Sequence, residues 1–125
     1  MQSGQSIMIV DDEPDITYII KKFLEVNGME VDAFNDAEEA LSHFQTGMYA
    51  LSILDIGMPK MNGFELYREI RNIEPKVKVC FLSAYETLGE NRGFPRSELK
   101  CVLQKPISMP ELVKHVRWEM ALMVA

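Results

Sequence analysis

Three aspartates directly follow short apolar runs in the sequence, a pattern that can build a metal site. Asp11 and Asp12 come after the run 7–10, and Asp55 comes after the run 51–54. An aspartate in this position projects from the carboxyl end of a buried strand, where open α/β sheets bind ligands. Three carboxylates at one edge repel each other unless a cation lies among them, and oxygen ligands favour Mg²⁺ over transition metals. The sequence therefore predicts a magnesium site.

Two further polar side chains follow apolar segments. Ser83 comes after 77–82, and Lys105 comes shortly after 101–103 and directly before Pro106. We expect their loops to reach the same edge of the sheet as the aspartates. A metal, a cation, a hydroxyl donor and an aspartate that can act as nucleophile are what phosphoryl transfer to a carboxylate requires.

Strand-like and helix-like segments alternate along the chain, which favours an α/β fold with a parallel sheet covered by helices. Strands are predicted at 7–10, 30–34, 51–54, 77–82 and 101–103. Helices are predicted from Pro14 to Gly28, from Asp36 to Gly47, between the loop 57–60 and Pro75, and from Ser108 onward. Glycine and proline interrupt the segment 85–100, so we expect at most a short helix there.

The apolar residues at helical spacing indicate which face of each helix meets the core. They are Ile16, Ile19, Ile20, Phe23 and Leu24 in the first helix, Ala37, Ala40, Leu41 and Phe44 in the second, Phe64, Leu66, Ile70 and Ile73 in the third, and Leu112, Val113, Val116, Met120 and Met123 in the last. Asp36 with Glu39, and Ser108 with Glu111, match the spacing of a capping box.

The composition is typical of one globular domain, predicted over residues 1–125. A net charge of −6 without a basic stripe argues against nucleic-acid binding. No apolar run approaches the roughly 20 residues that a membrane-spanning helix needs, and residues 1–5 lack the regions of a signal peptide. We therefore expect a cytoplasmic protein that binds neither nucleic acid nor membrane.

Cys80 and Cys101 fall in predicted strands. Neither has a nearby CxxC partner or an obvious activating base. We interpret both as reduced thiols that act as small hydrophobic residues, and the alternative is a redox role.

Four stretches of the sequence together resemble the response-regulator receiver domain of two-component signalling. The stretches are Ile9-Val10-Asp11-Asp12-Glu13-Pro14, Leu54-Asp55-Ile56-Gly57-Met58-Pro59-Lys60-Met61-Asn62-Gly63, Leu82-Ser83-Ala84 and Lys105-Pro106-Ile107. They occur in the family's order and at the family's spacing, and the resemblance covers essentially the whole chain. It implies a (βα)₅ flavodoxin-like fold whose doubly wound parallel sheet has the strand order 2-1-3-4-5.

The resemblance also implies a role for each site residue. Asp55 would accept a phosphoryl group from a phosphohistidine on a histidine kinase or phosphotransfer protein. Asp12, Asp55 and the main-chain carbonyl of Gly57 would bind Mg²⁺ directly, and Asp11 would assist through water.

The resemblance further implies that Lys105 would pair with the phosphoryl group and that Ser83 would turn inward to hydrogen-bond it. The Lys105–Pro106 peptide would be cis, as is usual in the family. Such a domain is not an enzyme for other substrates, because it catalyses only its own phosphorylation and dephosphorylation. Phosphorylation would switch contacts with an effector, an output domain or a second copy of the chain through the family's fourth helix, fifth strand and fifth helix.

The chain departs from the family at Val102, where receivers usually carry an aromatic residue that swings inward. The switch would then depend on other groups, with Tyr85, Phe94 or the backbone after Ser83 as candidates. Tyr85 is also predicted to screen the acyl phosphate from water and to slow its hydrolysis.

Three other side chains leave alternatives open. His43 and His115 are interpreted as surface or boundary residues. Trp118 is predicted to point away from the core-facing stripe of its helix. It either packs on the segment before 101–103 or belongs to a partner or dimer surface.

Two rival functions compete with the phosphoacceptor role. A Mg²⁺ phosphohydrolase of the haloacid dehalogenase type needs a second acid two positions after its nucleophile, and here that residue is Gly57. A receiver that binds partners without phosphorylation has no support in the sequence, because no member of the acidic, hydroxyl and lysine set is missing.

Overall fold

The computed structural model describes residues 6–84 and 101–121. The predictions made for the segment 85–100, including those for Tyr85 and Phe94, and the placement of Met123 lie outside the described residues.

Five parallel strands form the centre of the fold in the order β2-β1-β3-β4-β5. The strands are β1 (Ser6–Val10), β2 (Glu30–Phe34), β3 (Leu51–Asp55), β4 (Val79–Ser83) and β5 (Val102–Gln104). The helices of the described residues are α1 (Pro14–Val26), α2 (Ala37–His43), α3 (Gly63–Ile73) and α4 (Met109–Ala121). The structure confirms the predicted fold class and strand order, and α4 is the helix predicted from Ser108.

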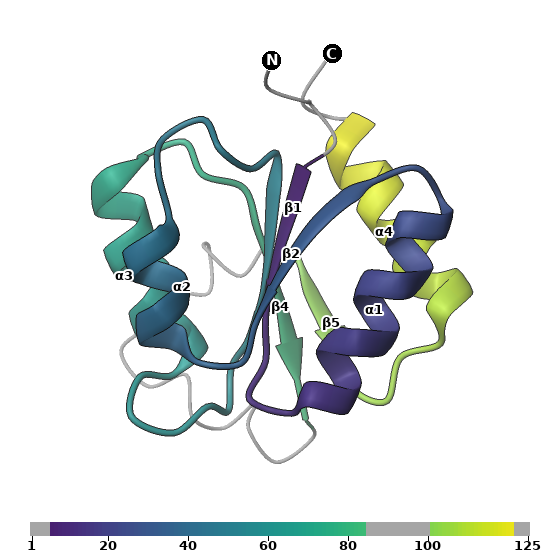
Figure 1. Cartoon of the computed structure of the whole chain (residues 1–125), viewed down its shortest axis with the longest axis horizontal. Helices are drawn as coiled ribbons and strands as arrows, with labels where there is room; N and C mark the ends of the chain where they lie inside the picture. The colour runs from purple at the N-terminus through teal and green to yellow at the C-terminus, as the bar shows by residue number, and fades with distance from the viewer. Residues whose placement is uncertain (1–5, 85–100, 122–125) are drawn as a thin grey trace.

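Helices cover both faces of the sheet, α1 and α4 on one side and α2 and α3 on the other (Figure 1). The inner strands β1 and β3 are buried almost throughout, as expected for parallel strands between two helical layers. Two core clusters result: Ile7 and Ile9 of β1 face α1 and α4, whereas Met8 and Val10 face α2 and α3. The sheet is therefore a rigid frame for the loops at its edge.

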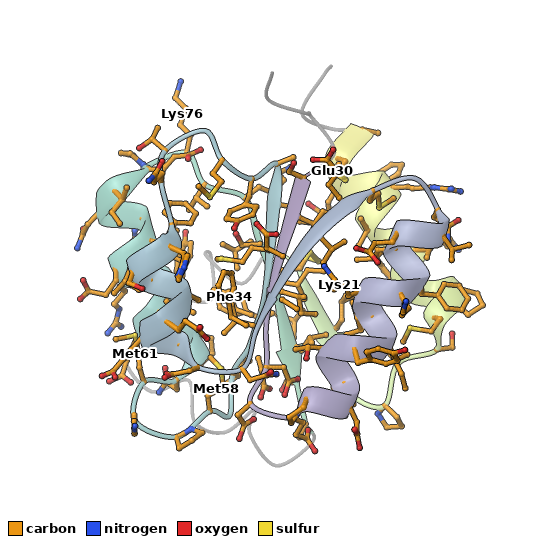
Figure 2. The ribbon with its side chains drawn as sticks, in the orientation of Figure 1. Lys21, Glu30, Phe34, Met58, Met61 and Lys76 are labelled. Carbon is orange, nitrogen blue, oxygen red and sulfur yellow. A yellow bond between two sulfur atoms is a disulfide. The ribbon has the colours of Figure 1, made fainter. Side chains whose placement is uncertain are left out.

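Side chains fill the space between each helical layer and the sheet (Figure 2). On one side, Lys21 of α1 reaches the sheet and donates to the carbonyl oxygen of Val31 in β2 at 2.6 Å. On the other side, Met58 in the loop after β3 is buried in the core beneath α2 and α3. These contacts hold the helices at fixed positions above the strands.

The predicted helix starts are confirmed, with changes of detail at the caps. Pro14 begins α1, and Gly28 follows its end with φ +90°, which glycine adopts without a steric penalty. Asp36 caps α2, but its carboxylate accepts from the backbone N–H of Glu38. Ser108 Oγ accepts from the backbone N–H of Glu111 at 3.3 Å.

The most complete cap was not predicted. Asn62 accepts from the backbone N–H of Glu65 at 2.9 Å, and the Glu65 carboxylate accepts from the backbone N–H of Asn62 at 2.9 Å. This capping box fixes the start of α3 immediately after the loop that follows Asp55.

Three residues of the predicted core-facing stripes are exposed. Ile19 and Phe23 of α1 and Ile73 of α3 are 48%, 39% and 42% exposed. The stripe that a helix buries against a sheet is narrow, so residues at its margin stay in contact with solvent. Thr17 is buried in α1 instead, because its hydroxyl donates to the carbonyl oxygen of Pro14 at 3.1 Å.

Cys80 and Cys101 form a disulfide, so the interpretation of both as reduced thiols is wrong. Phe81 of β4 pairs with Val102 of β5, and Cys80 and Cys101 lie one position earlier in that register. Their Cα atoms are therefore only 4.6 Å apart, within the range that a disulfide spans. The sequence did not reveal this pairing because it depends on strand register.

Candidate functional site

The predicted site residues meet at the carboxyl edge of the sheet. Asp11 and Asp12 follow β1, Asp55 ends β3, Ser83 ends β4, and Lys105 follows β5 directly. Because these strands are parallel, their ends deliver all five side chains to one edge.

Asp55 is held in a nearly closed environment, with 3% of its surface exposed. Its Oδ1 is 3.4 Å from Lys105 Nζ and accepts a hydrogen bond from the backbone N–H of Gly57 at 3.4 Å. Burial and the negative charge of Asp11 raise the pKa of Asp55 to about 6, although Lys105 and the Gly57 N–H oppose the shift. A carboxylate with few competing partners is suited to act as a nucleophile.

Asp11 is fully buried beside Asp55. Its Oδ1 accepts from the backbone N–H of Glu13 at 3.0 Å, and its Oδ2 lies 2.8 Å from Lys105 Nζ. Burial raises the pKa of Asp11, and the lysine only partly offsets this effect. Two buried carboxylates thus share one ammonium group.

Lys105 is the cation that joins these groups. Burial alone would lower its pKa, but the hydrogen bond and charge of Asp11, together with Asp55 and Glu13, raise it above the usual range. Lys105 Nζ also lies 3.2 Å from Glu13 Oε1. The Lys105–Pro106 peptide is cis, as the resemblance implies.

Ser83 is fully buried at the end of β4. Its hydroxyl donates to the carbonyl oxygen of Ala84 at 3.0 Å. The backbone N–H of Lys105 donates to the carbonyl oxygen of Ser83 at 2.8 Å, so the two strand ends that carry these residues are tied together.

Glu13 and Asn35 also contact the site residues, although neither was predicted to have a role. Glu13 pairs with Lys105, whereas Asn35 donates to the carbonyl oxygen of Asp11 at 2.8 Å and to Thr17 Oγ1 at 2.9 Å. Asn35 directly follows β2, so the rule that found the other site residues could have found it as well. Glu13 continues the acidic run that begins at Asp11, and its place in that run was the only sequence feature that could have indicated a role for it.

The acidic residues form a group that suits a divalent cation. One carboxylate oxygen from each of Asp11, Asp12 and Asp55 lies within 4.8 Å of the others. Asp11 Oδ2 is buried, and Lys105 Nζ is its partner at 2.8 Å, so this oxygen keeps lone-pair capacity for a further cation. All-oxygen donors of this kind match the preference of Mg²⁺.

The loop after β3 holds Asp55 against the start of α3. Gly63 begins α3, and its backbone N–H donates to the carbonyl oxygen of Ile56 at 3.1 Å. A Cβ atom on Gly63 would lie 2.5 Å from the backbone oxygen of Asp55. Only glycine allows the helix to approach the strand end this closely.

Comparison with known proteins identifies the family. The family model for the response regulator receiver domain matches residues 7–117. This chain belongs to the response regulator receiver family. The five candidate site residues all lie within the matched residues.

Individual receiver relatives agree with this assignment. The response regulator receiver protein CpdR of Brucella abortus is 29% identical over 110 residues, covering 88% of this chain and 92% of its own. A receiver domain protein from Clostridium thermocellum superposes with a TM-score of 0.85 at 28% identity, covering 94% of this chain and 95% of the other. TrrA of Thermotoga maritima, solved in complex with Mg²⁺ and BeF, gives a TM-score of 0.77 at 33% identity, covering 95% of this chain and 99% of the other.

The receiver unit also occurs within longer relatives. The chain spans less than half the length of several curated relatives that it matches, including transcriptional regulatory proteins. The phosphoacceptor role is the general function of the family, whose members interact with histidine kinases and effector domains. Within the described residues, none of the helices has the length and hydropathy to span a bilayer.

Proposed function

We propose that this receiver accepts a phosphoryl group on Asp55 in a Mg²⁺-dependent reaction, with a phosphohistidine of a cytoplasmic kinase or phosphotransfer protein as donor. The observation that carries the proposal is the position of Asp55. Its carboxylate is buried, 3.4 Å from Lys105 Nζ, within a cluster of three acidic residues at the edge of the sheet.

The chemistry follows from the charges around Asp55. A carboxylate oxygen attacks phosphorus, the bond from phosphorus to the histidine nitrogen breaks, and the electron pair leaves with the imidazole. Asp12, Asp55 and the main-chain carbonyl of Gly57 would hold Mg²⁺, with Asp11 assisting through water. When bound, Mg²⁺ neutralises the carboxylates and the phosphoryl oxygens.

Lys105 and Ser83 would then bind the new phosphoryl group. The ammonium of Lys105 is shared among Asp11, Asp55 and Glu13 and is already beside the acceptor. The hydroxyl of Ser83 donates to the neighbouring carbonyl of Ala84 and would turn to donate to a phosphoryl oxygen. These changes would bias the surface of β5 and α4, where a partner, an output domain or a second copy binds.

The test is phosphorylation of the chain by a small phosphodonor such as phosphoramidate, followed on a phosphate-affinity gel. We expect a shifted band that requires Mg²⁺ and disappears in Asp55→Asn. The matched control is Asp36→Asn, because asparagine also caps helices well. Equal phosphorylation of wild type and Asp55→Asn would contradict the proposal.

An apolar cavity beside Lys105 supports docking of a protein donor. It has a volume of about 620 Å³ and is lined by Ile16, Ile19 and Ile107 among other residues. Contacts there would place a donor next to Asp55. Ile19→Ser should therefore slow phosphotransfer from a kinase while leaving phosphorylation by phosphoramidate unchanged. Equal slowing with both donors would mean that Ile19 acts through the fold and not through docking.

A further inference from the structure

Both cysteines of the chain are joined in the disulfide between β4 and β5. Cys80 is 1% exposed and Cys101 is 7% exposed, and both pack in the core cluster on the side of α1 and α4. The phosphorylation chemistry proposed above uses neither residue.

The disulfide links the two strands that carry the phosphate-binding side chains. Ser83 lies three residues after Cys80, and Lys105 lies four residues after Cys101. β5 has only three residues, and among residues 6–84 and 101–121 it pairs with β4 alone. The covalent bond therefore anchors one end of a short edge strand whose other end positions Lys105.

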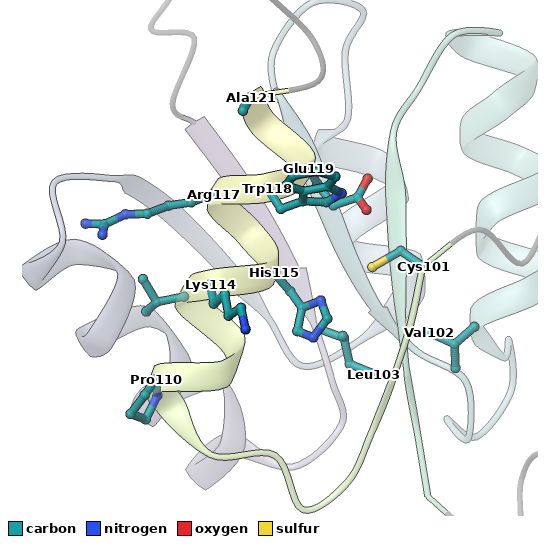
Figure 3. Close-up of a pocket in the computed structure, with 11 residues that line it drawn as sticks. Cys101, Val102, Leu103, Pro110, Lys114, His115, Arg117, Trp118, Glu119 and Ala121 are labelled. Carbon is teal, nitrogen blue, oxygen red and sulfur yellow. The ribbon is translucent and has the colours of Figure 1, made fainter.

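Cys101 is the sulfur that a solvent molecule can approach. It borders a cavity of about 870 Å³, which is also lined by residues of α4 that include His115, Trp118 and Glu119. Cys101 directly precedes β5, and its side chain points toward α4 (Figure 3). Attack on Cys101 would make Cys80, the more deeply buried of the two, the leaving group.

One acidic residue lies beside the disulfide. A carboxylate oxygen of Glu119 is within 4.8 Å of both sulfur atoms, and Glu119 Oε1 is 3.5 Å from Lys78 Nζ. A nearby negative charge disfavours a thiolate, and a less stable leaving thiolate departs more slowly. Glu119 thus protects the disulfide against reduction.

We propose that Cys80–Cys101 is a thiol–disulfide exchange site whose redox state sets the rate of phosphorylation at Asp55. The reductant is a low-molecular-weight thiol that enters through the cavity at Cys101. This inference rests on the proposed function of Asp55, and the cytoplasm assigned there is a compartment where disulfides are mostly catalytic or redox-sensing.

The exchange is balanced over two steps. A thiolate attacks Cys101 Sγ, the S–S bond breaks, and its electron pair passes to Cys80 Sγ, which takes up a proton. A second thiolate then attacks the external sulfur of the mixed disulfide and releases Cys101 as a thiol. The external thiols supply two electrons and leave as their own disulfide.

Reduction would loosen β5. Two unbonded sulfur atoms need more space than a disulfide, because non-bonded atoms keep about 3.5 to 4 Å between them. That space must be made within a core that contains Leu112, Val113 and Val116 of α4. Displacement of β5 moves Lys105, which follows that strand directly, away from the acceptor, and small displacements of positioning groups cost much of the rate.

The first test counts thiols in the intact chain, purified without reductant, by reaction with Ellman's reagent after denaturation. We expect no free thiol before treatment with dithiothreitol and two afterwards. Two free thiols in the untreated protein would overturn the proposal.

The second test measures phosphorylation of oxidised and reduced wild-type protein by phosphoramidate and Mg²⁺. We expect reduction to slow the reaction by about tenfold, and reoxidation to restore the rate. A Cys80→Ser, Cys101→Ser variant should be slow in both conditions, with its fold verified by circular dichroism. Equal rates for oxidised and reduced wild type would overturn the proposal. Phosphorylation of neither form would instead overturn the proposed function.

Glu119→Gln tests the residue beside the disulfide. The half-time of reduction by dithiothreitol should shorten severalfold, because the leaving thiolate is no longer opposed by a negative charge. Glu69→Gln, on exposed α3 surface across the sheet, is the matched control and should reduce at the wild-type rate. Equal half-times for both variants would remove Glu119 from the proposal.

Discussion

At the scale of single residues, the site concentrates negative charge that the fold itself does not fully compensate. Asp11 and Asp55 are both buried, and one lysine serves the two. This arrangement disfavours ionisation of Asp55, as its pKa of about 6 indicates. It also makes a cation from solvent a favourable addition to the site.

Asp55→Asn should stabilise the protein without Mg²⁺ in a pH-dependent way. The pKa of Asp55 is about 6 in the folded state and 3.8 in a model compound, so the folded state binds this proton more tightly. The resulting cost of ionisation appears as the pH rises from about 4 to 6 and is fully present above pH 6. We expect the variant to gain roughly 3 kcal/mol at pH 7.5 and nothing at pH 4, measured by urea unfolding. An equal gain in stability at both pH values would show that the pKa of Asp55 is not raised in the folded state.

Mg²⁺ should stabilise the wild type through the same charges. At a concentration ten times the dissociation constant, an ion that binds only the folded state adds about 1.4 kcal/mol. We expect Tm to rise on addition of MgCl₂ and to return on addition of EDTA. The gain should be smaller in Asp12→Asn, which removes an exposed member of the acidic cluster. The control Glu69→Gln should respond like the wild type.

At the scale of elements, the contact between β3 and α3 sets the shape of the acceptor loop. Gly63 begins α3 directly against the backbone of Asp55, and the capping box of Asn62 and Glu65 fixes the direction in which the helix leaves. The loop therefore has little freedom between the nucleophile and the helix.

Gly63→Ala should disrupt both stability and phosphorylation. The added Cβ would lie 2.5 Å from the backbone oxygen of Asp55, so α3 must move. We expect a loss of about 2 kcal/mol and a lower phosphorylation rate with phosphoramidate. Gly47→Ala is the control: its φ of +77° strains alanine by about 1 kcal/mol, but a Cβ there meets no atom within 4 Å. If Gly63→Ala were the milder variant, the contact would not restrict the loop.

At the scale of the whole molecule, the face formed by β5 and α4 carries exposed apolar side chains beside an edge strand. Val102 on β5 is 36% exposed and Trp118 on α4 is 64% exposed, and both border the cavity at Cys101. The prediction that Trp118 points away from the core is confirmed. An exposed tryptophan beside an apolar cavity suits a partner or a second copy of the chain.

Phosphorylation should promote dimerisation through this face. We expect the mass measured by sedimentation to increase toward that of a dimer after treatment with phosphoramidate and Mg²⁺, and Trp118→Ala to prevent the increase. Tyr18→Ala is the matched control, since Tyr18 on α1 is 62% exposed. A constant mass in wild type would exclude the homodimer and leave a different partner for this face.

Much of the fold and the site could be predicted because both depend on local pattern. Continuous apolar runs marked buried strands, and the polar residue that follows each run identified Asp11, Asp55 and Ser83. Because the strands run parallel, their carboxyl ends lie at one edge of the sheet, and these three side chains therefore lie close together. It could not show that Ile19 and Phe23 are exposed, because that depends on how far α1 is rotated against its sheet.

The sequence by itself determined which polar residue follows each strand and which charge that residue brings to the edge of the sheet. Both follow from position in the chain and from side-chain chemistry. Only the tertiary structure decided that Lys105 forms an ion pair with Glu13 and that Asn35 donates a hydrogen bond to the carbonyl oxygen of Asp11. It also decided that Cys80 and Cys101 form a disulfide. Each of these contacts joins residues far apart along the chain. Their distances are set by strand register and helix packing, which no local pattern encodes.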